Sequence, residues 1–274
     1  MNYELNLRTI YFSATHTSEK VAKAISCAVA DEFAVEDITF GELKNPDFAA
    51  DDMLLVAVPV YGGGVAPVAL KRLEVMRGNN TPAVVVVVYG NRNFERAATQ
   101  MSDFLAERGF VTVAAAAFVG EHSYSTDENP VAVGRPNDGD IAEAQRFGEL
   151  IKAKMAGTMD AVDVAAMKCP DSGEENVKAF VEFVKGYQAE QAKNPVKLLP
   201  LTDEEKCVMC GVCVDVCPME AIDREDVSVV DASKCIKCCA CVKECPKEAK
   251  ILNSPFAPML SKYFASPKPN VWVM

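Results

Sequence analysis

The sequence predicts an α/β fold, in which a doubly wound, parallel, five-stranded sheet is followed by a smaller α+β domain. Two observations predict the sheet: segments with strand and helix periods alternate over residues 7–155, and the run from Val84 to Val88 is apolar without interruption. Strands covered by helices on both faces are continuously apolar, and such alternation is typical of parallel sheets. A duplicated cysteine pattern after residue 200 predicts the second domain.

The first domain is expected to contain five short, mainly apolar strands. They are residues 7–12, 34–40, 53–60, 83–89 and 110–119. Helices are expected where apolar residues recur at helical spacing. They are a helix carrying Val21, Ile25 and Val29, and then residues 66–76, 94–108, 140–155 and 174–191.

The chain of 274 residues is longer than one common domain, so two domains are expected. Pro195 and Pro200 mark the boundary before the second one. The predicted parts are a first domain over residues 1–160, a helical connector over 161–198, a second domain over 199–253 and a C-terminal tail over 254–274.

Eight cysteines near the end of the chain form two copies of one pattern, C-x-x-C-x-x-C-x-x-x-C-P, offset by 28 positions. They are Cys207, Cys210, Cys213 and Cys217, and then Cys235, Cys238, Cys241 and Cys245. The repeat extends to Asp203, Lys206 and Ala221, which recur as Asp231, Lys234 and Ala249. This is the ligand spacing of a protein with two [4Fe–4S] clusters.

A four-iron cluster needs thiolates from several directions, so the expected ligand sets are crossed between the repeats. Three ligands of each set come from one tight loop and the fourth from the Cys-Pro of the other repeat. The first set is Cys207, Cys210, Cys213 and Cys245, and the second is Cys235, Cys238, Cys241 and Cys217.

Zinc and disulfides are the alternative uses of these cysteines. Zinc sites favour separated Cys-x-x-Cys pairs, often with histidine, and no histidine follows residue 200. Disulfide frameworks belong to oxidising compartments, and no secretory signal is visible at the N-terminus. Of the other cysteines, Cys27 is expected to be a buried apolar residue, Cys169 a loop thiol, and Cys239 a neighbour of the ligands, with an exchange ligand as its alternative.

Three loops follow the first, third and fourth predicted strands, where an open α/β sheet binds its ligands. The first loop is rich in hydroxyls and opens a helix, whose free N–H groups attract a phosphate; helix capping is the other use of such residues. The other two each place a tyrosine, Tyr61 or Tyr89, beside glycine, which suits a flat ring. No G-x-G-x-x-G and no Walker loop follows the first strand.

These loops give residues 7–155 a resemblance to flavodoxin, and the whole chain, including residues 120–123 and 134–136, resembles flavodoxin–ferredoxin fusion proteins of anaerobic microbes. The resemblance implies a flavodoxin-like fold for the first domain and FMN as a second cofactor. Its implied contacts are Ser13, Thr15, His16, Thr17 and Ser18 for the phosphate, and Pro59, Val60, Tyr61, Gly62, Gly63, Tyr89, Gly90, Asn91, Arg92 and Phe94 for the ring. His16 stands where the family's loop usually has glycine, which predicts backbone strain or a donor to the phosphate.

The charge and hydropathy of the chain exclude some classes of partner. A net charge of −11 disfavours nucleic acid, because phosphates would be repelled. No apolar run reaches about 18 residues, so no membrane-spanning segment is expected. A redox protein or a small-molecule electron donor or acceptor is the expected partner, in the cytoplasm.

The expected function is that of an electron-transfer iron–sulfur flavoprotein, an oxidoreductase passing electrons between FMN and two [4Fe–4S] clusters in low-potential anaerobic metabolism. The alternative is a cluster-containing carrier or docking module whose flavodoxin-like domain has lost FMN. No nucleophile–base pair or substrate-specific acid stands out in the sequence.

Overall fold

The computed structural model describes residues 6–49 and 51–274, and the chain divides into two compact units that each use more than one stretch. Unit 1 consists of Met1–Glu121, Gly134–Pro170 and Lys268–Met274. Unit 2 consists of His122–Val133 and Asp171–Pro267. This division differs from the boundaries at residues 160, 198 and 253 that the sequence suggests, because the chain passes between the units four times.

Unit 1 is built on a sheet with the strand order β2-β1-β3-β5-β6-β9. The strands are β1 (Asn6–Tyr11), β2 (Ala34–Asp37), β3 (Asp52–Tyr61), β5 (Thr81–Tyr89), β6 (Phe110–Val119) and β9 (Val271–Val273), and β4 (Gly64–Val65) pairs with the end of β3. The first five in this order are parallel, which confirms the predicted parallel sheet. Their order corresponds to 2-1-3-4-5, the flavodoxin-like order of doubly wound folds.

The edge strand β9 was not expected from the sequence. It runs antiparallel to β6, with Ala116 opposite Trp272, and comes from the segment interpreted as a tail. Three residues are too few to show a strand period, so only the tertiary structure reveals this pairing.

The central strands are buried on both faces, as the valine run predicts. Val84, Val85, Val86 and Val87 are all inaccessible to solvent, and β5 lies between β3 and β6. Successive side chains of a strand point to opposite faces, so a continuous apolar run supplies the core on both sides of the sheet.

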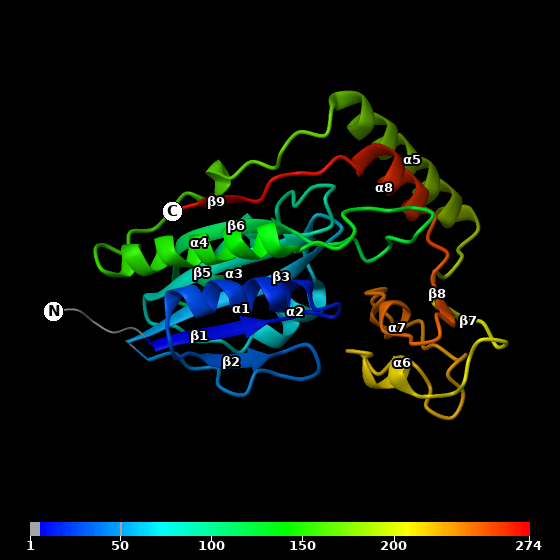
Figure 1. Cartoon of the computed structure of the whole chain (residues 1–274), viewed down its shortest axis with the longest axis horizontal. Helices are drawn as coiled ribbons and strands as arrows, with labels where there is room; N and C mark the ends of the chain where they lie inside the picture. Colours follow the sequence, from blue (N-terminus) through cyan, green and yellow to red (C-terminus); the bar gives the residue numbers. More distant parts are fainter. Residues whose placement is uncertain (1–5, 50) are drawn as a thin grey trace. The chain divides into compact units, whose positions relative to one another are not determined.

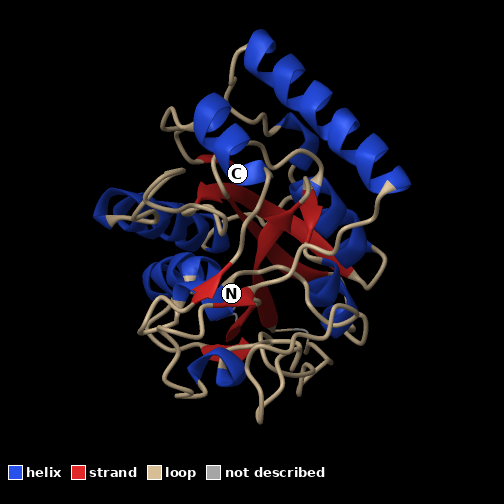
Figure 2. Ribbon diagram, turned by 90° about the vertical axis from the view of Figure 1, so that its right-hand side faces the viewer, coloured by secondary structure: helices blue, strands red, loops and turns tan. Residues whose placement is uncertain are grey.

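Helices cover both sides of this sheet (Figure 2). Helix α1 (Thr17–Val29) and helix α4 (Asp138–Met155) lie side by side over one face (Figure 1). They approach so closely that a Cβ on Gly148 would lie 2.5 Å from the carbonyl oxygen of Ile25. The crossover through α1 leads from β1 to β2. The crossovers through α2 (Pro67–Leu73) and α3 (Ala97–Ala106) lead from β3 to β5 and from β5 to β6, in the opposite direction along the sheet. Because such connections are right-handed, α2 and α3 lie on the opposite face from α1.

Unit 2 contains an aromatic helix pair and a small region of loops and short elements. Helix α5 (Glu174–Lys193), predicted from its periodicity, packs against α8 (Phe256–Phe264) through ring contacts such as Phe180 with Phe264 at 5.2 Å. The cysteine repeats hold the short helices α6 (Val212–Asp215) and α7 (Ala240–Lys243), with the strands β7 (Leu201–Thr202) and β8 (Lys250–Ile251) beside them. Among the described helices, none has the length and hydropathy of a membrane span.

Candidate functional site

The two cysteine repeats of unit 2 have the same backbone conformation. Left-handed residues recur at the 28-residue offset, as in Met209 (φ 55°) with Lys237 (φ 58°), and Glu220 (φ 49°) with Glu248 (φ 51°). Non-glycine residues rarely adopt this conformation, so its recurrence marks a repeated three-dimensional motif. In each motif the third cysteine lies on a short helix, Cys213 on α6 and Cys241 on α7, and the first two cysteines precede that helix.

Two separate cavities collect the eight cysteines into two groups of four. Their volumes are the same, about 20 Å³ each. The first cavity is lined by Cys207, Cys210, Cys213 and Cys245, and the second by Cys217, Cys235, Cys238 and Cys241. Each cavity thus receives three cysteines from one repeat and the Cys-Pro cysteine from the other. Among the described residues, no three or more Cys, His, Asp or Glu side chains gather closely enough to hold a single metal ion.

Burial and backbone amides act in opposite directions on these thiols. Burial raises the pKa of Cys238 to about 11 and that of Cys241 to about 12. At Cys245 burial also acts to raise the pKa, but amides of residues 247–250 outweigh it and lower the pKa. The Cys-Pro cysteines accept matching bonds, from Ala221 N to Cys217 Sγ at 3.3 Å and from Ala249 N to Cys245 Sγ at 3.2 Å. Such amides stabilise the thiolates that iron requires.

The three remaining cysteines lie in different surroundings. Cys239 lines the second cavity, is 3 % exposed and has φ 63°, and its Sγ lies 3.8 Å from the carbonyl oxygen of Lys237. Cys169 is half-buried in unit 1. The expectation that Cys27 is buried was wrong, because Cys27 is exposed. It lies two residues from Ile25 and from Val29, and two residues are about half a helical turn, so it faces away from their buried stripe.

The three loops predicted to bind a ligand lie together at the carboxyl edge of the sheet in unit 1. They follow β1, β3 and β5, which are parallel neighbours. A Cβ on Gly120, which follows β6, would lie 3.1 Å from Cβ of Thr17, so the chain after β6 also closes against the first loop. This edge is the position at which open α/β sheets bind their ligands.

The first loop, residues 13–18, joins β1 to α1 and carries a buried hydroxyl without a partner. Ser13 is fixed by its N–H donating to Thr39 Oγ1 at 2.8 Å and by its Oγ accepting from Glu19 N at 3.0 Å. Ser18 is inaccessible to solvent, and within the described chain its Oγ has no hydrogen-bond partner. The first N–H groups of a helix have no acceptor within the helix, so this loop offers both amides and a hydroxyl to an anion.

His16 has φ 62° and precedes α1, in the left-handed conformation that glycine adopts without cost. Nδ1 of its exposed ring donates a hydrogen bond to Glu19 Oε2 at 2.9 Å. The loop therefore keeps the backbone shape suited to glycine while carrying a histidine. Thr15 and Thr17 are half-buried on either side of it.

The second and third loops are joined by a backbone hydrogen bond and by close packing. Gly62 and Gly63 have φ 59° and 83°, and Arg96 N donates to the carbonyl oxygen of Gly63 at 3.1 Å. The carboxylate of Glu95 occupies the space that a side chain on Gly63 would need, and Glu95 pairs with Arg92 at 2.6 Å. A larger residue at Gly63 would displace this carboxylate.

The two loop tyrosines differ in exposure. Tyr61, after Pro59 and Val60, is half-buried, as those two residues are. Tyr89 is 2 % exposed and meets Phe94 edge to face at 5.4 Å between ring centroids. Tyr89, which the sequence places beside glycine as a surface for a flat ring, is thus buried in the structure, where it packs against Phe94. Between them, Asn91 is fully buried with φ 61°, and Gly90 and Arg92 are half-buried.

Lys268 is a residue of this site that the sequence did not indicate. It is 7 % exposed, and its Nζ donates to the carbonyl oxygen of Arg92 at 2.6 Å. Nearby, Asn270 accepts from Val119 N and donates to Asp140 and Glu143 on α4. The segment leading into β9 thus holds the third loop in place. Lys268 and Asn270 belong to no periodic or motif pattern, so the sequence alone does not indicate that they hold this loop.

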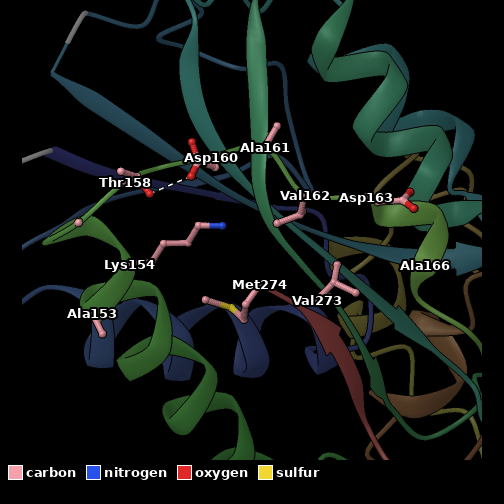
Figure 3. Close-up of a pocket in the computed structure, with 11 residues that line it drawn as sticks. Ala153, Lys154, Thr158, Asp160, Ala161, Val162, Asp163, Ala166, Val273 and Met274 are labelled. Carbon is pink, nitrogen blue, oxygen red and sulfur yellow. Dashed lines mark hydrogen bonds between the residues drawn. The ribbon is translucent and has the colours of Figure 1, made fainter.

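A further cavity of unit 1 lies away from the three loops, beside the end of α4 and β9 (Figure 3). Lys154 Nζ donates to the carbonyl oxygen of Val113 at 2.7 Å, and Thr158 Oγ1 donates to Asp160 Oδ2 at 2.8 Å. Lys154 and Thr158 thus already have hydrogen-bond acceptors. None of the residues predicted to bind a ligand lines this cavity.

Comparison with known proteins places the repeats in a family. Residues 199–246 match the family model of the 4Fe-4S dicluster domain. This domain implies two [4Fe–4S] clusters. No curated protein matches the chain.

Solved structures resemble the α/β part. A flavodoxin from the domain Archaea is 13 % identical over 56 % of this chain and 100 % of its own, with a TM-score of 0.38. A Bacillus cereus flavodoxin is 14 % identical over 54 % and 98 %, with 0.40. A Fusobacterium nucleatum flavodoxin bound to flavin mononucleotide is 16 % identical over the same shares, with 0.37. From its own strand order and the matched domain, the chain combines a flavodoxin-like parallel sheet with a 4Fe-4S dicluster domain, a pairing that indicates electron transfer and redox partners.

Proposed function

We propose that this protein is an electron-transfer iron–sulfur flavoprotein that holds two [4Fe–4S] clusters in unit 2 and one FMN in unit 1. The observation that carries the proposal is the sorting of eight pattern cysteines into two cavities of similar volume, four to each. Clusters of this kind accept and donate single electrons, whereas a flavin handles one or two, so one chain would connect the two kinds of redox chemistry.

The proposed ligand sets follow the cavities. The first cluster is held by Cys207, Cys210, Cys213 and Cys245, and the second by Cys235, Cys238, Cys241 and Cys217. Amides that donate to Cys217 and Cys245 would hold these thiolates and stabilise negative charge at the cluster sulfurs. Cys239 lies beside the second set and is proposed as a non-ligating neighbour, because its Sγ already contacts a carbonyl oxygen.

Anaerobically reconstituted protein is expected to contain about eight iron and eight sulfide per chain, since two four-iron cubanes demand it. Iron, sulfide and zinc analysis of the same sample measures this. Stoichiometric zinc without iron would contradict the cluster assignment. About four iron per chain would mean that only one of the two ligand sets holds a cluster.

The fit of FMN rests on the chain's own residues at the carboxyl edge of the sheet. The Oγ of Ser18 lies buried and unpartnered at the start of α1, where a phosphate could accept its hydrogen bond. Thr15, His16, Thr17 and Ser13 complete this loop, and Gly62 and Gly63 leave the backbone open to a flat ring. Pro59, Val60, Tyr61, Gly90, Asn91 and Arg92 would frame the ring, with Tyr89 and Phe94 packed beneath their loop. The redox partner would be a protein or a small-molecule donor or acceptor.

Replacing Ser18 with alanine is expected to weaken FMN binding by about tenfold or more, because a hydrogen bond to a charged group contributes about 1.5–3 kcal/mol. Riboflavin, which lacks the phosphate, should bind the variant and the unaltered protein alike. Calorimetric titration with both flavins measures the two affinities. Ser26→Ala is the matched control: Ser26 is also buried on α1, but its Oγ already donates to the carbonyl oxygen of Ala22 at 2.8 Å. Equal affinity of the unaltered protein for both flavins would refute the phosphate assignment.

A second candidate is a carrier or docking module whose flavodoxin-like unit has lost FMN, and the left-handed His16 favours it. A histidine with φ 62° costs about 1–2 kcal/mol that a glycine would avoid. Denaturing the purified protein separates the two functions. Release of a yellow compound with flavin absorbance supports the flavoprotein, and brown cluster absorbance alone supports the docking module.

A further inference from the structure

The two cluster cavities differ at one pair of equivalent positions. The 28-residue offset that relates the repeats makes Lys250 the counterpart of Ile222, just as Ala249 is the counterpart of Ala221. Lys250 lines the first cavity and Ile222 lines the second. Both are buried, at 3 % and 6 % exposure. The repeat has therefore placed a lysine beside one set of cysteines and an apolar side chain beside the other.

Lys250 is held firmly at the first cavity. Its Nζ donates to Thr202 Oγ1 at 2.8 Å and also to the carbonyl oxygen of Val227. Both acceptors are neutral. The charge of Lys250 also acts on the carboxylate of Asp226, but Asp226 is exposed, so water and salt screen this interaction. Burial raises the pKa of the Cys213 thiol, and the charge of Lys250 acts against that rise. The charge of Lys250 also acts against the rise that burial causes in the pKa of Cys241 of the second set, although Lys250 does not line that cavity.

The surroundings of the second set are apolar and better shielded. Its Cys238 is 8 % exposed, whereas the equivalent Cys210 of the first set is exposed. The lysine that lines the second cavity, Lys237, has an exposed side chain, which water and salt screen. The described second cavity therefore has no counterpart of the buried ammonium.

We infer that Lys250 makes the two clusters inequivalent, giving the cluster of the first set the higher reduction potential. Accepting one electron adds one negative charge to a cluster and neither forms nor breaks a bond. A buried positive charge beside the first cavity stabilises that added charge more than Ile222 can. Electrons entering unit 2 therefore come to rest on the first cluster. This inference rests on the proposed presence of both clusters.

The test is a redox titration of reconstituted protein, with dithionite as the electron donor and paramagnetic resonance as the readout. Cys235→Ala and Cys210→Ala each leave one complete set of four cysteines, the first and the second respectively. Lys250→Gln removes the charge but keeps N–H donors for Thr202 and Val227. In the Cys235→Ala background this change should lower the reduced-to-oxidised ratio at fixed potential by about tenfold, which is about 59 mV for one electron. In the Cys210→Ala background the shift should be smaller.

Two further variants separate charge from packing. Lys250→Arg keeps the charge and should leave the potential of the first cluster near its original value. Lys247→Gln removes a lysine that lines the same cavity but is exposed, and should shift the potential little. Equal shifts of both clusters on Lys250→Gln, or a shift as large for Lys247→Gln, would overturn the inference. Absence of iron from the unaltered protein would instead reject the clusters themselves, and iron analysis distinguishes the two failures.

Discussion

Combining Cys217→Ala with Cys238→Ala is expected to cost no more iron than either change alone, because both residues belong to the second cavity. Each single variant should lose one four-iron cluster and keep the other. Cys217→Ala combined with Cys210→Ala should lose both, since Cys210 lines the first cavity. Iron analysis and paramagnetic resonance of the reduced protein measure these losses.

A local scheme, in which each repeat holds its own cluster, makes the opposite forecast for the two double variants. Cys217 and Cys210 would then share a cluster, and Cys217 and Cys238 would not. Cys239→Ala is the internal control, because Cys239 lines the second cavity but is proposed not to ligate. Loss of a cluster in that variant would make Cys239 a ligand.

Replacing Asp140 with alanine is expected to lower the free energy of unfolding of unit 1 by about 3–5 kcal/mol, the usual cost of removing one partner of a buried ion pair. Asp140 is 4 % exposed, and its carboxylate accepts from Arg135 Nε at 2.9 Å and from Asn270 Nδ2 at 2.9 Å. It also caps α4 by accepting from Asn137 N at 2.9 Å. The change would leave the half-buried Arg135 charge without its carboxylate and remove the Asp140 bond that joins α4 to Asn270 before β9.

The chain's single tryptophan gives a direct measurement of this loss. Trp272 lies on β9 with its ring centroid 5.9 Å from that of Phe147 on α4, so urea unfolding followed by its fluorescence reports on unit 1. Asp138→Ala is the matched control, because Asp138 lies in the same first turn but is exposed. It should cost about 1 kcal/mol or less. Equal losses in the two variants would reject the role of the buried network.

The same network predicts a pH dependence. Burial acts to raise the pKa of Asp140, but the bonds from Arg135, Asn137 and Asn270 outweigh it and lower the pKa. A carboxyl whose folded pKa is depressed contributes stability above its unfolded pKa of about 3.9. The difference in stability between the unaltered protein and Asp140→Ala should therefore be constant near neutral pH and shrink as the pH falls below about 4.

The parts of the fold with strong periodic patterns were predictable from the sequence. The run Val84–Val88 predicted a strand covered on both faces, and the stripe of Val21, Ile25 and Val29 predicted α1. The cysteine repeat predicted the dicluster domain that the family model matches. In each case the pattern lies within a short stretch of sequence, and that stretch alone determines which side chains are buried or which cysteines recur.

Other features depend on contacts between residues far apart in the sequence. The strand β9 is only three residues long, and Lys268 contacts Arg92 from 176 positions away. Tyr89 stands beside a glycine, as a ring-binding tyrosine would, but its strand end is buried against Phe94. Burial of such a residue is decided by the packing around it, which local sequence does not encode. The sequence shows that Lys250 stands where the first repeat has Ile222. Only the structure shows that each of these residues lines a cysteine cavity.

The antiparallel pairing of β9 with β6 also bears on the order of events during synthesis. β6 ends at Val119, whereas its partner comes from residues 271–273, so the ribosome makes every cluster cysteine before it makes β9. A nascent chain can assemble the parallel strands first, while β6 still presents the unpaired N–H and C=O groups of an edge strand. Until residues 271–273 emerge, that edge is open to mispairing with other chains. Closure of the edge by β9 is thus a late step, which comes only after the cluster-binding repeat has been translated.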